Sequence, residues 1–294
     1  MERKPIFTGA ASAIITPMNE NGVDYENFKK LLNWQIDEGI DALVIAGTSG
    51  EGSTLTDEEH REVLKFAVEV VGGRVPVIAG TGSNDTAYAI DLTKFACEVG
   101  CDAMLVVTPY YNKATQKGLI KMFYEIADAS TKPIILYNVP SRTGVNISIP
   151  VLKELAKRDN IVAIKEASGN ISYTAQVAAE VPELYIYSGN DDMIVPVMSL
   201  GGKGVISVLA NVMPKETHEM CQAYFDGDCK KATKMQLDLL DLVNALFIEV
   251  NPIPVKTALN LMGKNAGNLR LPLVDMADDT LAKLKAVMAK HGLI

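Results

Sequence analysis

The sequence has few of the residues that bind metals or form disulfides. Its 294 residues include four cysteines and three histidines, and it contains no Cys-x-x-Cys pair. Cys97 and Cys101 lie four positions apart, a spacing that ordinary packed helices also show, and the histidines are scattered. We therefore expect no zinc site, and we interpret the cysteines, which include Cys221 and Cys229, as reduced structural thiols.

Positive charge and long apolar runs are also scarce. The formal net charge is −8, the isoelectric point is near 5.0 and no basic run occurs, which argues against a nucleic acid or an anionic membrane as partner. No stretch approaches the ~18 to 20 apolar residues of a membrane span. The segment from Met1 to Pro17 faintly imitates a signal peptide, but polar residues interrupt its short apolar part, so it is better interpreted as a first strand. We expect a soluble, cytoplasmic protein.

Apolar residues are abundant, at 48% of the chain, which is enough for one large α/β barrel or two smaller domains. Short apolar segments alternate with amphipathic patterns. Each segment is nearly continuous, as in strands that are buried on both faces. The eight predicted strands cover residues 11–16, 42–46, 75–79, 103–107, 134–137, 161–165, 184–187 and 204–208.

Helical patterns separate these strands. Thr56 and Glu59 have the spacing of a capping box, and Gly72-Gly73 follows the helix that this box would open. The other helices predicted between strands cover residues 25–37, 86–99, 116–129, 151–157 and 172–180. From Pro214 onward the pattern is helical only, with helices predicted at residues 230–250, 254–261 and 280–290.

Eight strand–helix units predict a closed parallel (β/α)8 barrel of the TIM type. A doubly wound open sheet is the alternative, but it usually carries a glycine-rich fingerprint after its first strand, and none is present there. We therefore predict a catalytic barrel over residues 1–213 and a C-terminal helical region over residues 214–294 that packs on it.

One lysine lies in a predicted strand, Lys165 at the end of the run 161–165. Taken alone, that strand favours an edge position whose lysine reaches water, because structural lysines outnumber catalytic ones. Tyr137 occupies a comparable position on the preceding strand, so the two side chains could face the same lumen. A phenol beside a lysine suits imine chemistry, for which a lysine pKa must fall from about 10.4 to ~7 at a cost of roughly 4.6 kcal/mol.

Two further strand ends could bind carboxylates, since chemistry in a barrel lies at the C-terminal ends of its strands. The loop Gly47-Thr48-Ser49-Gly50 offers backbone N–H groups and two hydroxyls, although a plain βα turn is an equally good interpretation. Arg142 could pair a carboxylate with two parallel hydrogen bonds, or it could be a surface charge on a loop.

Taken together, these strand ends resemble the pyruvate-dependent class I aldolase superfamily, and within it the dihydrodipicolinate synthase family. The similarity runs over essentially the whole chain. The segments that carry it are Gly47-Thr48-Ser49-Gly50-Glu51, Pro109-Tyr110-Tyr111-Asn112-Lys113, Tyr137-Asn138-Val139-Pro140-Ser141-Arg142-Thr143-Gly144, Ile164-Lys165-Glu166-Ala167-Ser168 and Asn251-Pro252-Ile253-Pro254-Val255-Lys256.

The resemblance implies a lyase that condenses pyruvate with L-aspartate 4-semialdehyde to 4-hydroxy-tetrahydrodipicolinate, the first committed step of the diaminopimelate and lysine pathway. Lys165 would form the Schiff base with pyruvate. A proton relay would consist of Tyr137, Thr48 and Tyr111, with Tyr111 supplied by a neighbouring subunit. The enzyme would be a homotetramer built as a dimer of dimers, and it would need no cofactor and no metal.

The same resemblance implies how the substrates are bound. Thr48 and Ser49 would hold the pyruvate carboxylate, and Arg142 the carboxylate of the semialdehyde. Gly189 and Ile206 would line the site through their backbones.

Feedback inhibition by lysine is a property of many bacterial members of this family. The sequence keeps the matching positions Ser53, His60, Asn84 and Tyr110 but departs at two others. Tyr88 stands where lysine-sensitive relatives carry glutamate, and Asp57 where they carry histidine. Because the lost carboxylate would face the ammonium group of the inhibitor, we expect lysine to inhibit weakly or not at all.

Two other functions compete with this one. Another pyruvate aldolase, such as N-acetylneuraminate lyase or a 2-keto-3-deoxy sugar acid aldolase, would share the scaffold, but Arg142 resembles the semialdehyde-binding element. A catalytically silent ligand-binding barrel is the alternative of another class. A sensor has no need of a reactive amine, so the joint presence of Lys165, Tyr137, Tyr111 and Thr48 argues against it.

Overall fold

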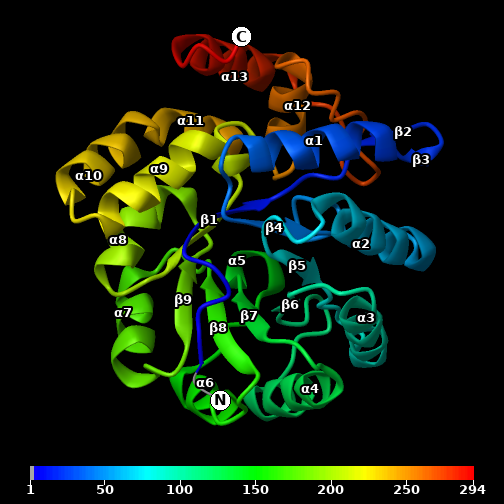
Figure 1. Cartoon of the computed structure of the whole chain (residues 1–294), viewed down its shortest axis with the longest axis vertical. Helices are drawn as coiled ribbons and strands as arrows, with labels where there is room; N and C mark the ends of the chain where they lie inside the picture. Colours follow the sequence, from blue (N-terminus) through cyan, green and yellow to red (C-terminus); the bar gives the residue numbers. More distant parts are fainter. Residues whose placement is uncertain (1–2) are drawn as a thin grey trace.

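The computed structural model describes residues 3–294, so the first two residues of the predicted barrel lie outside it. Eight parallel strands form a closed barrel in the order β1-β10-β9-β8-β7-β6-β5-β4, which confirms the predicted (β/α)8 fold (Figure 1). A short hairpin, β2 (Met18–Asn19) and β3 (Gly22–Val23), follows the first strand. The barrel strands are β1 (Gly9–Ala13), β4 (Ala42–Ile45), β5 (Val77–Gly80), β6 (Ala103–Val107), β7 (Ile134–Asn138), β8 (Ile161–Glu166), β9 (Tyr185–Ser188) and β10 (Gly204–Ser207).

Helices cover the outside of the barrel, and the sequence sets several of their ends. The Thr56 hydroxyl accepts from the Glu59 amide at 3.2 Å, and the Glu59 carboxylate accepts from the Thr56 amide at 3.0 Å, so the capping box is present. Gly72 ends the same helix in the left-handed region, as predicted. The barrel helices are α1 (Tyr25–Asp37), α2 (Asp57–Val71), α3 (Thr86–Glu98), α4 (Gln116–Ala129), α5 (Pro140–Thr143), α6 (Ile149–Leu155), α7 (Ile171–Glu180), α8 (Ile194–Ser199) and α9 (Pro214–Phe225), and the 3-10 turns are η1 (Asp191–Met193) and η2 (Leu209–Asn211).

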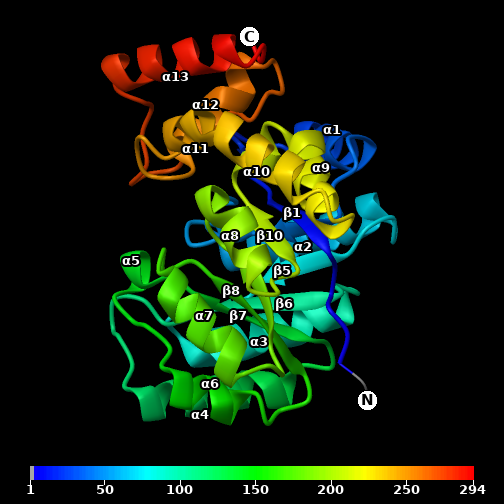
Figure 2. The same ribbon diagram turned by 90° about the vertical axis from the view of Figure 1, so that its left-hand side faces the viewer.

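The C-terminal helices stack at one end of the molecule (Figure 2). They are α10 (Cys229–Asp238), α11 (Leu240–Leu246), α12 (Ile253–Leu261) and α13 (Asp278–Lys290). Within residues 3–294, no helix combines the length and the apolar character that crossing a membrane requires. The division between barrel and C-terminal region after residue 213 stays a prediction. α9 begins just beyond this boundary but packs on β1 and η2, so it covers the wall of the barrel.

The prediction of one helix over residues 230–250 is wrong. The chain turns at Leu239 and leaves helical geometry at Phe247, although neither glycine nor proline interrupts it. The two halves pack on different partners, α10 against α8 and α9, and α11 against α12 and α13. A straight helix could not meet both surfaces, so packing outweighs local helix propensity here.

The buried apolar side chains form two separate clusters, one inside the barrel and one between the strands and the helices. Strand residues alternate between them: Ile135 and Tyr137 belong to the inner cluster, whereas Ile134 and Leu136 belong to the outer one. Lys165 lies two residues beyond Ala163, an inner residue, so its side chain points into the lumen. This alternation settles which face of each strand lines the barrel.

Candidate active site

The centre of the site is Lys165, beside Tyr137. The two residues are register partners on β8 and β7, and both are buried, with 6% and 7% of their surface exposed. Lys165 Nζ lies 4.4 Å from the centroid of the Tyr137 ring. The expectation that they share one depth and one lumen is confirmed. An amine held there is shielded from most water and has a phenol within reach.

Tyr187, which the sequence analysis did not single out, flanks Lys165 on the opposite side. It is the register partner of Lys165 on β9, and its ring stacks on Phe7 with centroids 4.3 Å apart. Its hydroxyl donates to the Phe7 carbonyl at 2.7 Å, and burial raises the pKa of this phenol. Tyr187 is therefore a neutral structural phenol in the inner cluster of the barrel. Its position in the run 184–187 matches that of Tyr137 and was a usable signal.

The loop after β4 has the features of an anion cradle. Within residues 3–294, the backbone amides of Thr48 and Ser49 donate to no protein acceptor. Ser49 is buried, whereas Thr48 is exposed and makes no hydrogen bond to Tyr137 within the part of the chain described. A Cβ at Gly52 would lie 2.2 Å from the Ala46 carbonyl oxygen, so the loop can close this tightly only with glycine there. Free amides beside a hydroxyl suit a carboxylate.

A buried ion pair fixes this loop from the far end of the chain. Lys256 Nζ on α12 lies 2.7 Å from Glu51 Oε1, and both side chains are 1% exposed. The ammonium group also donates to the carbonyls of Thr16 and Asn268, and Glu51 accepts from the Arg270 amide at 3.0 Å. Burial lowers the pKa of Lys256, but its donors are occupied and it has no access to solvent. Lys256 is therefore a structural lysine.

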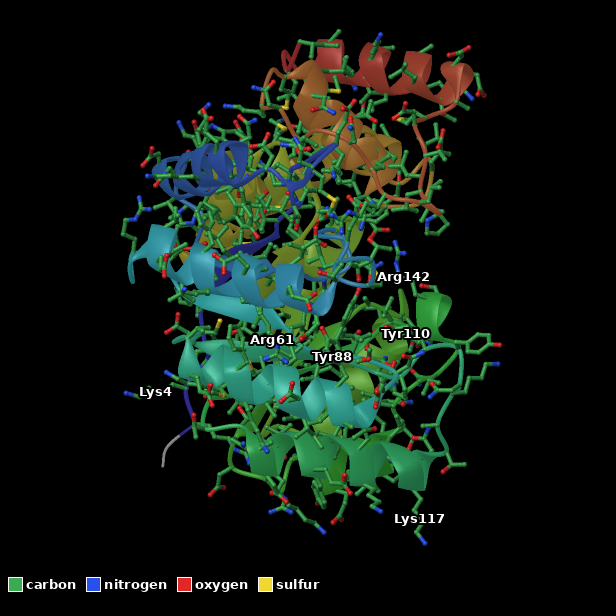
Figure 3. All side chains as sticks on the ribbon, turned by 90° about the vertical axis from the view of Figure 1, so that its right-hand side faces the viewer. Lys4, Arg61, Tyr88, Tyr110, Lys117 and Arg142 are labelled. Carbon is green, nitrogen blue, oxygen red and sulfur yellow. The ribbon has the colours of Figure 1, made fainter. Side chains whose placement is uncertain are left out.

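Arg142 lies on the one-turn helix α5, at the boundary between the barrel and the C-terminal region (Figure 3). Thr143 anchors the turn, because the Thr108 hydroxyl at the end of β6 donates to the Thr143 hydroxyl at 3.1 Å. Arg142 itself is exposed and donates through Nη2 to the Asn251 carbonyl at 3.2 Å. Its guanidinium keeps further donors free for a carboxylate.

Gly189 directly follows β9, and Ile206 lies in β10. The Gly189 amide donates to the Glu166 carbonyl at 2.7 Å, and a Cβ at Gly189 would lie 2.6 Å from the Ala167 Cβ. A larger residue would therefore push Ala167 into the lumen beside the lysine. Ile206 is buried in the inner cluster.

The structure does not bring Tyr111 to this centre. Tyr111 is 93% exposed, and its φ of 68° lies in the left-handed region, which is uncommon for a residue other than glycine. Within its own chain it is therefore not part of a relay with Tyr137.

Within residues 3–294, no cluster of three or more His, Cys, Asp or Glu side chains could hold a metal.

Sequence reasoning also missed Asn251, which is buried at the start of the segment leading into α12. Its side-chain Nδ2 donates to Ser49 Oγ at 3.0 Å, and its carbonyl accepts from Arg142. The signal was available, because Asn251 opens one of the segments that carried the family resemblance.

The fold and the site together define the class: a (β/α)8 barrel whose lumen holds a buried lysine beside a phenol at the strand ends, as in lysine-dependent aldolases. Residues 6–291 match the family model described as the Dihydrodipicolinate synthetase family. The chain belongs to that family.

Relatives in sequence and in structure match this chain over nearly its full length. The 4-hydroxy-tetrahydrodipicolinate synthase of Acetivibrio thermocellus is 56% identical over 99% of this chain and 100% of that protein. The solved dihydrodipicolinate synthase of Aquifex aeolicus superposes with a TM-score of 0.96 at 46% identity, covering 98% and 99% of the two chains. The chloride-inhibited enzyme of Acinetobacter baumannii, solved in complex with pyruvate, has a TM-score of 0.95 at 43% identity, covering 98% of this chain and 99% of that one.

Proposed function

We propose that the enzyme condenses pyruvate with L-aspartate 4-semialdehyde through a Schiff base on Lys165. The product is 4-hydroxy-tetrahydrodipicolinate, and the reaction is the first committed step of the diaminopimelate and lysine pathway. The family supports the reaction, and the relatives matched over their full length carry its name. The single observation that supports the residue assignment is the pairing of Lys165 with Tyr137 inside the lumen.

The chemistry follows from a shielded amine beside a proton donor. The neutral Lys165 amine attacks the C2 carbonyl of pyruvate, and water leaves as the iminium forms. Loss of a C3 proton gives an enamine, whose C3 adds to the aldehyde carbon of the second substrate. The amino group of that substrate then attacks the imine carbon, which closes the ring and frees the lysine. Tyr137 would carry protons during addition and dehydration.

Pyruvate and the semialdehyde each carry a carboxylate, so the site needs two groups that bind anions, at different depths. The free amides and hydroxyls of Thr48 and Ser49 suit the carboxylate of pyruvate, which must lie close to the lysine. Arg142 is exposed at the entrance and suits the carboxylate of the second substrate, which enters later. The backbones of Gly189 and Ile206 would line the site between them.

The relay is complete only if a second subunit contributes, and this too is part of the proposal. The almost fully exposed Tyr111 is available to a neighbour, and strain at its backbone is a feature that recurs at functional sites. We infer a homotetramer in which Tyr111 of one subunit enters the site of another. A cytoplasmic location belongs to the same proposal and is favoured by the free cysteines, of which Cys229 is exposed.

Trapping tests the assignment of the lysine. Reduction with borohydride in the presence of pyruvate should attach the adduct to the peptide that carries Lys165, as mass spectrometry would show. Lys165→Ala should abolish the adduct. Lys117→Ala is the matched control, because Lys117 lies on α4 and points away from the barrel (Figure 3). An adduct on Lys256, or none on the wild type, would overturn the assignment.

Substrate choice separates the proposal from its rival on the same scaffold. The enzyme should turn over pyruvate with L-aspartate 4-semialdehyde and should not turn over pyruvate with N-acetylmannosamine. The reverse result would favour an N-acetylneuraminate lyase.

A further inference from the structure

The side chain of Asn251 forms hydrogen bonds with Ser49. Asn251 Nδ2 lies 3.0 Å from Ser49 Oγ, and Asn251 Oδ1 lies 3.5 Å from the same oxygen. Both residues are buried, at 5% and 2% exposed. An amide nitrogen can only donate, so the serine oxygen is the acceptor in the short contact.

This geometry decides where the serine proton can go. The only acceptor that Asn251 offers to the hydroxyl is Oδ1, and a distance of 3.5 Å makes a weak hydrogen bond. The hydroxyl proton is therefore free to turn toward an incoming anion beside the free amides of Thr48 and Ser49. Without the donor at Asn251, the same hydroxyl would have no other partner within residues 3–294 that fixes its orientation.

The main chain of Asn251 holds the second anion-binding group. Its carbonyl accepts from Arg142 Nη2 at 3.2 Å, so one residue contacts both groups assigned to carboxylates. Asn251 is itself held in place, because Lys256, five residues later, is locked to Glu51 in the same loop as Ser49. The C-terminal region therefore fixes this part of the site.

We propose that Asn251 is a positioning residue, whose side-chain amide makes Ser49 a hydrogen-bond donor to the carboxylate of pyruvate and whose carbonyl holds Arg142 in place. The inference rests on the proposed function. It predicts an effect on pyruvate binding and only a small one on the chemistry at Lys165, because within residues 3–294 Asn251 makes no hydrogen bond to Lys165 or Tyr137.

Steady-state kinetics of two variants test this. Asn251→Ala should raise the KM for pyruvate about tenfold while kcat changes less than threefold. Asn251→Asp should raise the KM further, about a hundredfold, because a carboxylate would accept the serine proton and repel the substrate. A merely structural role predicts the opposite order, since Asp has nearly the shape of Asn. An Asp variant equal to or better than the Ala variant would overturn the proposal.

The double variant shows whether the effect passes through Ser49. In a Ser49→Ala background, adding Asn251→Ala should change the KM for pyruvate less than twofold, whereas a tenfold further rise would contradict the proposal. The KM for the semialdehyde should change less than that for pyruvate in every Asn251 variant, because the carbonyl that holds Arg142 is kept.

Asn244→Ala on α11 is the matched control, because Asn244 is exposed in the same region and should behave as wild type. If Asn251→Ala does not fold, the comparison of Asn251→Asp with Ser49→Ala decides, and the Asp variant must bind pyruvate worse. If the wild type cannot be trapped with pyruvate, the proposed function fails. If it is trapped and the Asn251 variants bind pyruvate normally, only the role of Asn251 fails.

Discussion

Tyr137 presents the face of its ring to Lys165, with Nζ 4.4 Å from the ring centroid, and Tyr187 is the register partner of the same lysine on the other neighbouring strand. The contact that positions the amine is therefore separate from the hydroxyl that would carry protons. Packing and proton transfer at Tyr137 can be separated by removing one oxygen atom.

Tyr137→Phe keeps the ring and deletes the hydroxyl. We expect kcat to fall by about 10²- to 10⁴-fold, the usual contribution of a general acid–base group, with the thermal midpoint within a few degrees of wild type. Borohydride should still label Lys165 after prolonged incubation with pyruvate. Steady-state rates and trapping yields measure the two effects, and an unchanged kcat would remove Tyr137 from the relay.

Mixing two inactive variants tests whether Tyr111 acts in a neighbouring subunit. Lys165→Ala lacks the amine and Tyr111→Phe lacks the phenol. In a mixed dimer, the subunit that keeps Lys165 would receive a normal Tyr111 from its partner. Half of randomly mixed dimers are hybrids with one active site of two, so the activity recovered should be about a quarter of wild type. Mixtures that stay inactive would place Tyr111 in its own subunit or outside the reaction.

Lysine should inhibit weakly, because the residue at the critical position, Tyr88, carries no negative charge near neutral pH. Burial, and then the nearby Asp57 carboxylate, raises the pKa of Tyr88 to about 12, so its phenol stays neutral. Arg61 lies beside it (Figure 3) and pairs with Asp57 at 2.9 Å. A missing carboxylate should cost about 1–3 kcal/mol of inhibitor binding.

An inhibition curve with lysine measures this directly. Tyr88→Glu should increase sensitivity to lysine without changing kcat in its absence. Strong inhibition of the wild type at submillimolar lysine would show that the prediction is wrong.

The attachment of α13 should weaken in acid. Hydrogen bonds from Lys290 and, second, from His291 lower the pKa of Asp241 to about 2, well below the ordinary range of an aspartate. The two contacts measure 2.6 and 2.8 Å. Because the folded-state pKa is depressed, the stabilisation is complete above about pH 4 and is lost as the pH falls toward 2. Asp241 is partly exposed, so solvent screening limits the effect to below about 1 kcal/mol.

Urea unfolding of wild type and Asp241→Asn at pH 6 and at pH 3 tests this. The wild type should be the more stable at pH 6, and the difference should shrink at pH 3. A difference that does not depend on pH would contradict the ionic origin of the contact.

Local patterns in the sequence predicted much of the barrel. Position within the run predicted that Tyr137 and Lys165 share one depth, and the register of the two strands confirms it. The face that each strand turns to the lumen could not be predicted, because the strands are apolar on both faces. The capping box at Thr56 is equally local. The roles assigned to Ser49 and Arg142 stay predictions, although both residues lie at strand ends, as expected.

What the sequence could not show depends on contacts between distant residues. Glu51 meets Lys256 across 205 positions, and Ser49 meets Asn251 across 202, so no local pattern predicts either contact. The turn at Leu239 is likewise imposed by the separate surfaces on which α10 and α11 pack. The surroundings of Tyr111 in an assembly would depend on a second chain.

The dependence of the loop at Glu51 on Lys256 sets an order of events during synthesis. A ribosome that has released only the strands of the barrel has made every residue assigned to covalent chemistry. It has not yet made the lysine that neutralises Glu51, or the asparagine beside Ser49. A nascent chain should therefore hold Lys165 beside an unfinished loop at Ser49 and Glu51 until translation is nearly over.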